Sequence, residues 1–208
     1  MTELTLARRR AAGAVVPHRT LTSLRGESID LPDPRALTHL QFRRFAGCPV
    51  CDLHLQSIAK RHAELAAAGV REVVLFHSTA AELRAHGADR LPFPVIADPN
   101  KQLYYELGVE SGARALLDPR AWLYIARAIA RTSWAILCGR ARAPSLRPRG
   151  GRYGLPADFL LASDGRVLAC HYGSHAYDQW SVDDVLTLAR TCERTLFELG
   201  DARQNAEV

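Results

Sequence analysis

Near the start of the chain, two short runs of mixed hydrophobic and polar residues lie on either side of a turn sequence. Residues 20–24 and 28–31 flank an Arg-Gly-Glu turn, and the pattern predicts a small hairpin. Residues 36–45 alternate partly, through Leu40 and Phe42, and predict a further strand that leads into a Gly-Cys-Pro turn.

A helical period begins at Pro49. Apolar side chains then recur about every 3.6 residues up to Gly69, a residue type that suits the left-handed cap of a helix. They are Val50, Leu53, Ile58 and Leu65. We therefore expect one helix between Pro49 and Gly69.

Strands and helices alternate in the middle of the chain. Residues 72–77 are a short apolar run rich in β-branched side chains, which is typical of a buried parallel strand. Residues 80–86 predict a helix, and residues 93–97 predict a short strand because the run contains proline. Residues 101–107 predict another helix that a glycine ends.

The remaining elements are a long helix, a hairpin and a closing helix. Residues 119–138 start with a proline that suits a first helical turn. Residues 158–162 and 166–172 predict strands joined by an Asp-Gly turn, and residues 182–199 predict the last helix. The stripe on the long helix consists of Leu123, Ala126, Ala130 and Trp134, and the inner face of the last helix of Val185, Leu188, Ala189, Cys192 and Leu196.

This order of elements predicts an α/β fold. Strands that alternate with helices imply a mostly parallel sheet covered on both faces, and the late hairpin adds antiparallel strands, so the central sheet is mixed. We expect one domain over residues 16–200, with an insertion at 119–154, and tails at 1–15 and 201–208.

Composition narrows the class of protein. Of 208 residues, 48% are hydrophobic and 24% charged, as in an ordinary globular protein. No run of about 18 apolar residues could span a membrane, and the first residues lack the order of a signal peptide, so we expect a cytoplasmic protein. The net charge of +5 comes from arginines at 8–10 and at 140–152. Stacking aromatics do not interleave them, which predicts a solvated tail and loop and no nucleic-acid partner.

Five cysteines are too few for a disulfide scaffold. Cys138, Cys170 and Cys192 are isolated among apolar neighbours, where buried inert thiols are expected. Only Cys48 and Cys51 form a pattern, Cys-Pro-Val-Cys, between a predicted strand and a predicted helix.

The position of this pair at a helix start suits thiol chemistry. Cys48 is expected at the N-cap with Pro49 in the first turn, where unpaired backbone N–H groups and the helix dipole stabilise a thiolate. Cys51 lies one turn on and could attack a mixed disulfide or a sulfenic acid.

Two other interpretations of the pair stay open, namely half of a metal site and simple packing. A structural zinc needs a second pair at similar spacing, and the nearest candidates, Cys170, His171 and His175, lie far along the chain. We therefore expect no metal and no other cofactor.

Three residues near the pair could modulate its chemistry. His54 is expected on the same helix face as Cys51, either near the thiols or as a partly exposed polar residue. Arg43 and Arg44 precede the pair, and whichever of them points to the thiols would lower a thiol pKa.

The chain resembles the AhpC/TSA branch of the thioredoxin superfamily, in particular peroxiredoxin-like proteins with a Cys-X-X-Cys motif. The resemblance covers about residues 20–199 and rests on FRRFAGCPVC, EVVLFHSTAAEL, LPFPVIADPNKQLYYELGV and LPADFLLASDGRVLACHYG. It implies a thioredoxin-like fold, with Cys48 as the attacking or peroxidatic cysteine and Cys51 as the resolving one.

The chain departs from the family pattern in two places. Gln41 and Phe45 stand where peroxiredoxins carry the proline and threonine of Pro-X-X-X-Thr-X-X-Cys. Leu155 and Pro156 stand where the family has an arginine before the last hairpin. Pro156 resembles the cis-proline that shapes the substrate groove of thioredoxins, although a plain strand-entry proline is the alternative.

These features favour a thiol-dependent oxidoreductase that cycles Cys48 and Cys51 between dithiol and disulfide. Its substrate would be a small hydroperoxide or a disulfide, and its reductant an external thiol system such as thioredoxin. The alternative is a non-enzymatic redox-sensing or partner-binding module that docks through the long helix. Trp122 and Trp134 on that helix could also support a homodimer.

Overall fold

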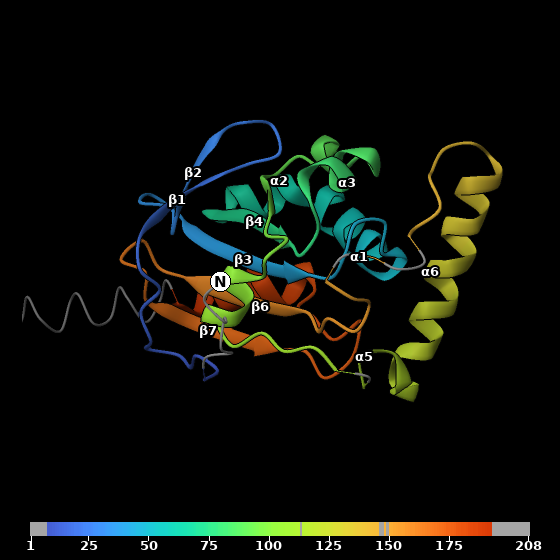
Figure 1. Cartoon of the computed structure of the whole chain (residues 1–208). Helices are drawn as coiled ribbons and strands as arrows, with labels where there is room; N and C mark the ends of the chain where they lie inside the picture. The colour runs from blue at the N-terminus through green and yellow to red at the C-terminus, as the bar shows by residue number, and fades with distance from the viewer. Residues whose placement is uncertain (1–7, 113, 146–147, 149, 193–208) are drawn as a thin grey trace, which may run out of the picture.

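The structure is a computed structural model that describes residues 8–112, 114–145, 148 and 150–192 (Figure 1). Its centre is a five-stranded mixed sheet in the order β5-β4-β3-β6-β7. The strands are β3 (Leu37–Arg43), β4 (Val70–Phe76), β5 (Val95–Ala97), β6 (Ala157–Leu161) and β7 (Val167–Tyr172). The three N-terminal strands of this sheet are parallel, and β6 and β7 add the predicted antiparallel hairpin.

The predicted N-terminal hairpin is confirmed as a separate two-stranded sheet. Its strands are β1 (Arg19–Thr22) and β2 (Ser28–Leu31), paired antiparallel. The chain before it lies along β7, where Gly13 N donates to Val167 O and Val16 N to Gly165 O, both at 2.8 Å.

Helices cover both faces of the sheet, which confirms the predicted α/β architecture. One apolar core lies between the sheet and α1, α2 and the helix at 182–192, and the other lies between the sheet, α4 and the N-terminal hairpin. The helices are α1 (Pro49–Lys60), α2 (His62–Ala67), α3 (Ala80–Ala85), the 3-10 helix η1 (Ala88–Arg90), α4 (Gln102–Glu106), α5 (Arg114–Leu117) and α6 (Pro119–Leu137).

The single helix predicted between Pro49 and Gly69 is wrong, because it breaks at Arg61. The backbone of Arg61 leaves the helical region at φ −113° and ψ 16°, and its N–H donates to Ile58 O in a tighter turn. Its side chain then binds Glu64 and Asp183. Gly69 ends α2 with a positive φ of 68°, as the cap prediction required.

The long helix α6 does not cover the core with its apolar stripe, as an amphipathic helix usually does. Its predicted apolar stripe is exposed: Leu123 by 75% and Trp134 by 67% of their surface. The helix instead packs against α1 with a small-residue face, on which Ala121 and Ala128 are fully buried. Alanines allow two helices to approach closely, whereas the larger side chains are left toward solvent. Figure 1 shows α6 as a separate column beside the body of the molecule.

The closing helix is described over residues 182–192, with Val185 and Ala189 buried as predicted. The remainder of the predicted helix, including Leu196, and the predicted tail at 201–208 lie outside the described residues. No helix in the described part of the chain is long and apolar enough to cross a membrane.

Candidate active site

Cys48 lies where the chain turns from β3 into α1. It is the N-cap of α1, with φ −62° and ψ 115°, and Pro49 follows in the first turn, as predicted. The preceding Gly47 has a φ of 74°, and a Cβ there would come within 2.5 Å of the His86 ring. The turn therefore needs glycine both for its conformation and for the close approach of His86.

The surroundings of the two sulfurs give them opposite protonation states. Cys48 Sγ accepts the backbone N–H of Cys51 at 3.4 Å and the Arg44 Nη1 donor at 3.7 Å. Burial alone would raise the pKa of Cys48, but the Cys51 thiol, the Arg44 charge and backbone N–H groups of α1 lower it to about 6. Burial and the neighbouring Cys48 thiolate raise the pKa of Cys51 well above its ordinary value. At neutral pH, Cys48 is thus a thiolate and Cys51 a thiol.

Arg44 is the arginine that reaches the thiols. Its side chain is buried, its Nη2 donates to the backbone carbonyl of Arg152, and its guanidinium lies 5.3 Å from the centre of the Phe45 ring. Phe45 cannot donate the hydrogen bond of the family threonine, but it holds the cation beside Cys48. Arg44 thus supplies, from the cysteine loop, a positive charge next to Cys48.

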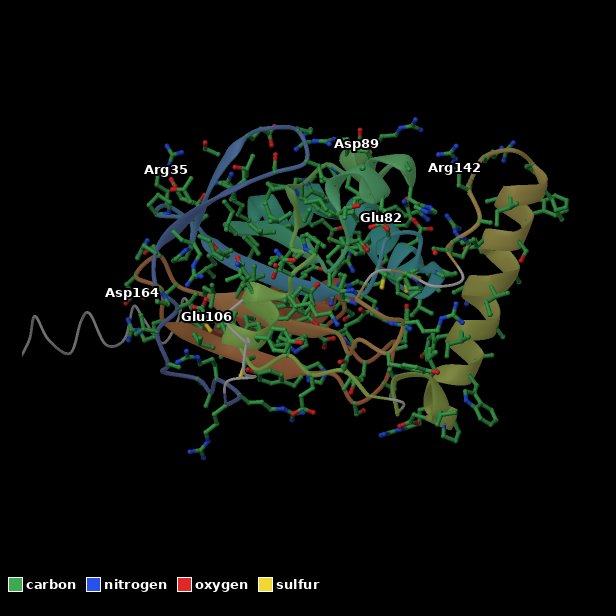
Figure 2. The ribbon with its side chains drawn as sticks, viewed as in Figure 1. Arg35, Glu82, Asp89, Glu106, Arg142 and Asp164 are labelled. Atoms are coloured by element: carbon green, nitrogen blue, oxygen red, sulfur yellow. The ribbon has the colours of Figure 1, made fainter. Side chains whose placement is uncertain are left out.

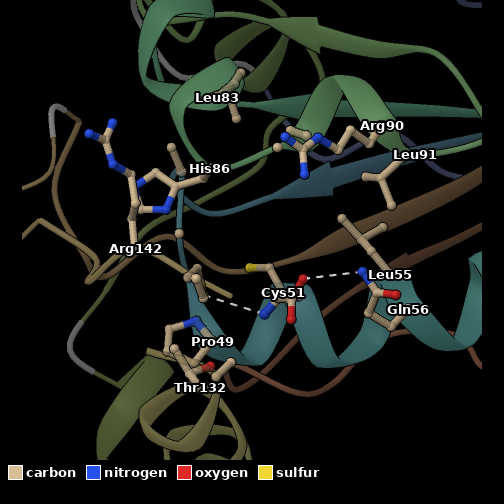
Figure 3. Close-up of a pocket in the computed structure, with 18 of the residues that line it drawn as sticks. Pro49, Cys51, Leu55, Gln56, Leu83, His86, Arg90, Leu91, Thr132 and Arg142 are labelled. Atoms are coloured by element: carbon tan, nitrogen blue, oxygen red, sulfur yellow. Dashed lines mark hydrogen bonds between the residues drawn. The ribbon is translucent and has the colours of Figure 1, made fainter. Parts of the chain in front are cut away.

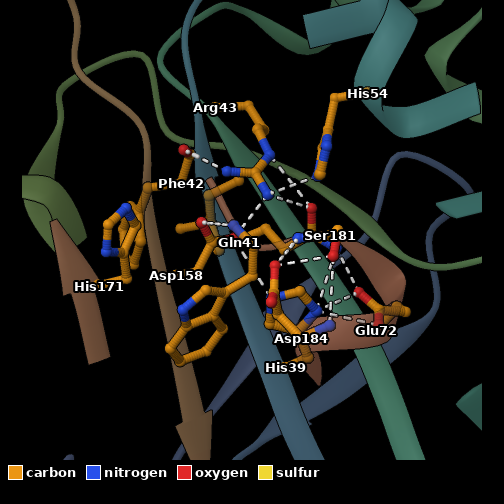
Figure 4. A network of polar contacts seen from close by, with 12 residues as sticks. His39, Gln41, Phe42, Arg43, His54, Glu72, Asp158, His171, Ser181 and Asp184 are labelled. Carbon is orange, nitrogen blue, oxygen red and sulfur yellow. Dashed lines mark hydrogen bonds and ion pairs between the residues drawn. The ribbon is translucent and has the colours of Figure 1, made fainter. Parts of the chain in front are cut away.

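Arg43 points away from the thiols into a buried polar network on the α1 face of the sheet (Figure 4). Its Nη2 donates to Asp158 Oδ1 at 2.6 Å and to Gln41 Oε1 at 2.5 Å. His39 joins Glu72 through Nδ1 at 3.0 Å and Asp158 through Nε2 at 3.2 Å. All five side chains are fully buried.

Charges in this network balance. Burial would lower the pKa of His39, but Glu72 and Asp158 raise it to about 9, so His39 is a cation. Burial would raise the pKa of Asp158, but Arg43 and His39 hold it far below its ordinary value. Two cations therefore face two carboxylates inside the core.

His54 belongs to this network rather than to the surface. It is only 3% exposed, so its interpretation as a partly exposed residue is wrong. Arg43 Nη2 lies 3.1 Å from His54 Nε2 and donates to it. Burial first, and then the Arg43 charge, hold the pKa of His54 well below its ordinary value, so the ring is neutral.

A cavity of about 760 Å³ opens at the start of α1. Cys48, Pro49 and Cys51 line it, and the other walls come from α3, η1, α6 and the loop after α6 (Figure 3). The long helix and its arginine loop thus form part of the site. Sequence reasoning missed this cavity, including His86, because its walls come from segments far apart in the chain.

Pro156 does not fit the thioredoxin interpretation. The described residues contain one cis peptide bond, Leu31–Pro32, so the Leu155–Pro156 bond is trans. Pro156 is absent from the residues that line the cavity, and its carbonyl accepts the Gly173 N–H at 2.9 Å. Its ring packs against Gly173 next to β6, which matches the alternative of a strand-entry proline.

The isolated cysteines are less buried than the sequence predicted. Cys138 is exposed because the end of α6 projects into solvent, and Cys170 and Cys192 are partly buried. His171, one of the residues considered for a zinc site, binds Asp178 at 2.8 Å. Among the described residues, no group of three His, Cys, Asp or Glu side chains is placed to hold a metal ion.

A five-stranded mixed sheet with a thiolate and a thiol at the first turn of the helix after its central strand defines a thioredoxin-like redox protein. The family model described as AhpC/TSA antioxidant enzyme matches residues 57–175, which is more than half of the chain. The chain belongs to this family. The match begins after Cys51, so both cysteines precede the matched segment. No curated protein matches the sequence.

Solved structures confirm the fold. Peroxidoxin BcpB from Mycobacterium tuberculosis is 16% identical with a TM-score of 0.60, over 87% of this chain and 97% of that one. A cysteine-to-serine mutant of peroxiredoxin 6 from Arenicola marina is 15% identical with a TM-score of 0.64, over 90% and 75%. A peroxiredoxin-like protein from Aquifex aeolicus is 12% identical with a TM-score of 0.60, over 89% and 90%.

Proposed function

We propose that this protein is a thiol-dependent oxidoreductase in which Cys48 attacks an oxidised small molecule and Cys51 resolves the product. The observation that carries this proposal is the geometry at Cys48 Sγ, which accepts the Cys51 amide at 3.4 Å and the Arg44 Nη1 donor at 3.7 Å. The pKa of Cys48 is lowered to about 6, whereas that of Cys51 is raised. Only a thiolate attacks, so the first step belongs to Cys48.

With a hydroperoxide, the cycle balances as follows. The Cys48 thiolate attacks the terminal peroxide oxygen, the O–O bond breaks, and the leaving alkoxide takes a proton to become an alcohol. Cys48 is then a sulfenic acid, which condenses with the Cys51 thiol to give a disulfide and water. An external dithiol of the thioredoxin type would reduce this disulfide and become oxidised in turn.

Two observations favour a hydroperoxide over a protein disulfide. Cys48 is only 2% exposed and is reached through a cavity in the size range of small-molecule sites. In addition, the trans Pro156 outside the cavity removes the feature that favoured disulfide exchange. Because the proposed cycle needs a supply of reduced thiols, a cytoplasmic location fits it.

The decisive experiment mixes the reduced protein with hydrogen peroxide in a stopped-flow fluorimeter. Tryptophan fluorescence would give the second-order rate, and intact mass would count the oxidised sulfurs. We expect a rate well above that of a free thiol and a product with one Cys48–Cys51 disulfide. In Cys51→Ser, the same fast first step should end in a sulfenic acid that dimedone traps. A rate no better than that of a free thiol would overturn the peroxidase proposal.

A redox-sensing or partner-binding role is the second candidate, and the exposed face of α6 favours it. Trp122 and Leu137 are exposed by 58% and 81% of their surface on this face, beside the cavity that contains Cys48. Such a face could pair with a second copy in a homodimer. Steady turnover with thioredoxin and peroxide would favour the enzyme, whereas one oxidation per molecule without turnover would favour the sensor.

A further inference from the structure

The cavity beside Cys48 has a cationic wall. Five arginines line it, and the single acidic residue among its lining is Asp52. The arginines come from four segments of the fold that meet at this opening. They are Arg84 on α3, Arg90 on η1, Arg131 on α6, and Arg140 and Arg142 on the loop after α6. Figure 2 shows Arg142 between α6 and the segment that carries Asp89.

Most of these charges lack a partner within the part of the chain that the structure describes. Arg84 donates to the backbone carbonyl of Leu24 at 2.7 Å. The other four, from η1, α6 and its loop, make no side-chain hydrogen bond or ion pair with any described residue. Several arginines elsewhere do have a carboxylate partner, as in the Arg19–Glu106 and Arg61–Asp183 contacts at 2.6 and 2.8 Å. Five arginines that converge with a single carboxylate, that of Asp52, repel one another, so an anion in the cavity would relieve that repulsion.

His86 shows that the positive field extends toward the thiols. Its ring lies against Gly47, next to Cys48, and Figure 3 shows Arg142 beside it. Burial lowers the pKa of His86, and the Arg142 charge lowers it further, while Glu82 acts in the opposite direction. The arginine wall and the reactive sulfur therefore share one electrostatic environment.

Part of the cavity wall is apolar. Leu55, Leu83 and Leu91 line the cavity together with the cysteines and the arginines. A molecule that fills this space must therefore offer an apolar body as well as a negative charge.

We propose that the cavity binds an organic hydroperoxide that carries a carboxylate. The carboxylate would bind the arginine wall, the apolar body would lie on the leucines, and the peroxide would reach Cys48. This substrate class rests on the proposed peroxidase function, and the reaction is the one given above, in which Cys48 becomes a sulfenic acid and the peroxide becomes an alcohol.

A matched pair of substrates tests the proposal. Cumene hydroperoxide and its para-carboxylate share the same peroxide group and differ in charge. We expect the carboxylate to oxidise Cys48 at least about tenfold faster at low salt. This preference should shrink as sodium chloride rises from about 10 mM to about 1 M, because the Debye length falls from about 30 to about 3 Å.

A double variant and a control variant test which arginines cause the preference for the carboxylate peroxide. Arg131→Gln combined with Arg142→Gln should remove most of the preference, measured as the ratio of the two rates in the same variant. The control is Arg127→Gln, one turn earlier on the same helix. Arg127 is exposed but does not line the cavity, so the preference should persist. Equal rates for the two peroxides, or an equal loss in the control, would overturn the proposal.

A binding measurement distinguishes failure of the peroxidase function from failure of the anion site. The two alcohol products, with and without the carboxylate, are titrated calorimetrically into Cys48→Ser protein. If no peroxide reacts but the carboxylate alcohol alone binds, and does so through Arg131 and Arg142, the anion site stands and the peroxidase function falls. If both peroxides react and neither alcohol shows arginine-dependent binding, the anion site falls and the peroxidase function stands.

Discussion

Arg43 and Arg44 are neighbours in the chain, but their guanidinium groups lie in two different electrostatic environments. Arg43 enters a network in which Asp158 and Glu72 balance its charge and that of His39. Arg44 instead lies beside Cys48, whose pKa is lowered by the Cys51 thiol, by that arginine and by the backbone of α1.

The two adjacent arginines therefore have different roles, one in the buried network and one at the thiol site. A buried charge that keeps all its partners is neutral to stability on balance, but removal of one partner leaves the other charge buried and unpaired. The network should therefore respond to mutation mainly through folding. The thiol site keeps its charge available to a substrate, so its variants should change reactivity more than stability.

The largest expected effect is that of Cys48→Ser. Loss of the nucleophile should reduce hydroperoxide consumption by roughly 10⁴-fold or more. Serine is a good N-cap, so the free energy of unfolding should change by about 1 kcal/mol or less. Peroxide consumption and urea denaturation measure the two quantities, with Cys138→Ser as a control at an exposed cysteine. Full activity in Cys48→Ser would refute the assignment of the nucleophile.

Asp158→Asn should have the opposite profile. It leaves two buried cations, Arg43 and His39, with one carboxylate, and should cost about 3 kcal/mol of unfolding free energy. Alkylation of Cys48 in the folded variant should stay within about threefold of the wild type. The matched control is Asp164→Asn, an exposed carboxylate in the β6–β7 turn that should change stability by less than about 0.5 kcal/mol. Comparable losses in both variants would mean that the network is not a special contributor to stability.

The network should also make stability depend on pH. The pKa of His39 is raised to about 9, so its contribution is complete below its ordinary value of 6.5 and is lost as pH rises through 9. In Cys48→Ser/Cys51→Ser protein, which removes the two thiols of the site, the unfolding free energy should fall by roughly 3 kcal/mol between these pH values. Urea denaturation across this range measures the slope. His39→Gln in the same background should flatten it, and an unchanged slope would place its origin in other groups.

Arg44→Gln should give the smallest effect and the most specific one. Loss of the cation should raise the pKa of Cys48 by about one unit, so at pH 6 less thiolate is present and iodoacetamide should react severalfold more slowly. The pH profile of alkylation gives the midpoint. Arg166→Gln, at an exposed arginine, should leave the midpoint at about 6. A midpoint that stays there in Arg44→Gln as well would leave the helix backbone and Cys51 as the stabilising groups.

Local signals explain what could be predicted from the sequence. Pro49 and the Cys-Pro-Val-Cys spacing specify a helix start by backbone chemistry alone, and Cys48 is indeed its N-cap. The apolar runs of β4 and β6 were recognisable because both strands are buried on both faces.

Features decided by a distant partner could not be predicted. The α6 stripe through Leu123 and Trp134 has a helical period, but the period alone does not say which face α1 will cover. His39, Gln41 and Arg43 alternate with apolar residues, which also describes a strand with one face in solvent. Only the pairing of β3 with β4 and β6 turns that polar face into the buried network.

The N-cap of α1 has a consequence for the dynamics of the oxidised protein. Cys48 Sγ accepts the amide of Cys51, so the atom that would react with peroxide also fastens the first turn of the helix. Oxidation to a disulfide would remove the negative charge from that acceptor and weaken the cap. Amide hydrogen exchange at Cys51 should then be faster in the oxidised protein than in the reduced one, so that the fraying of one helical turn would report the redox state of the chain.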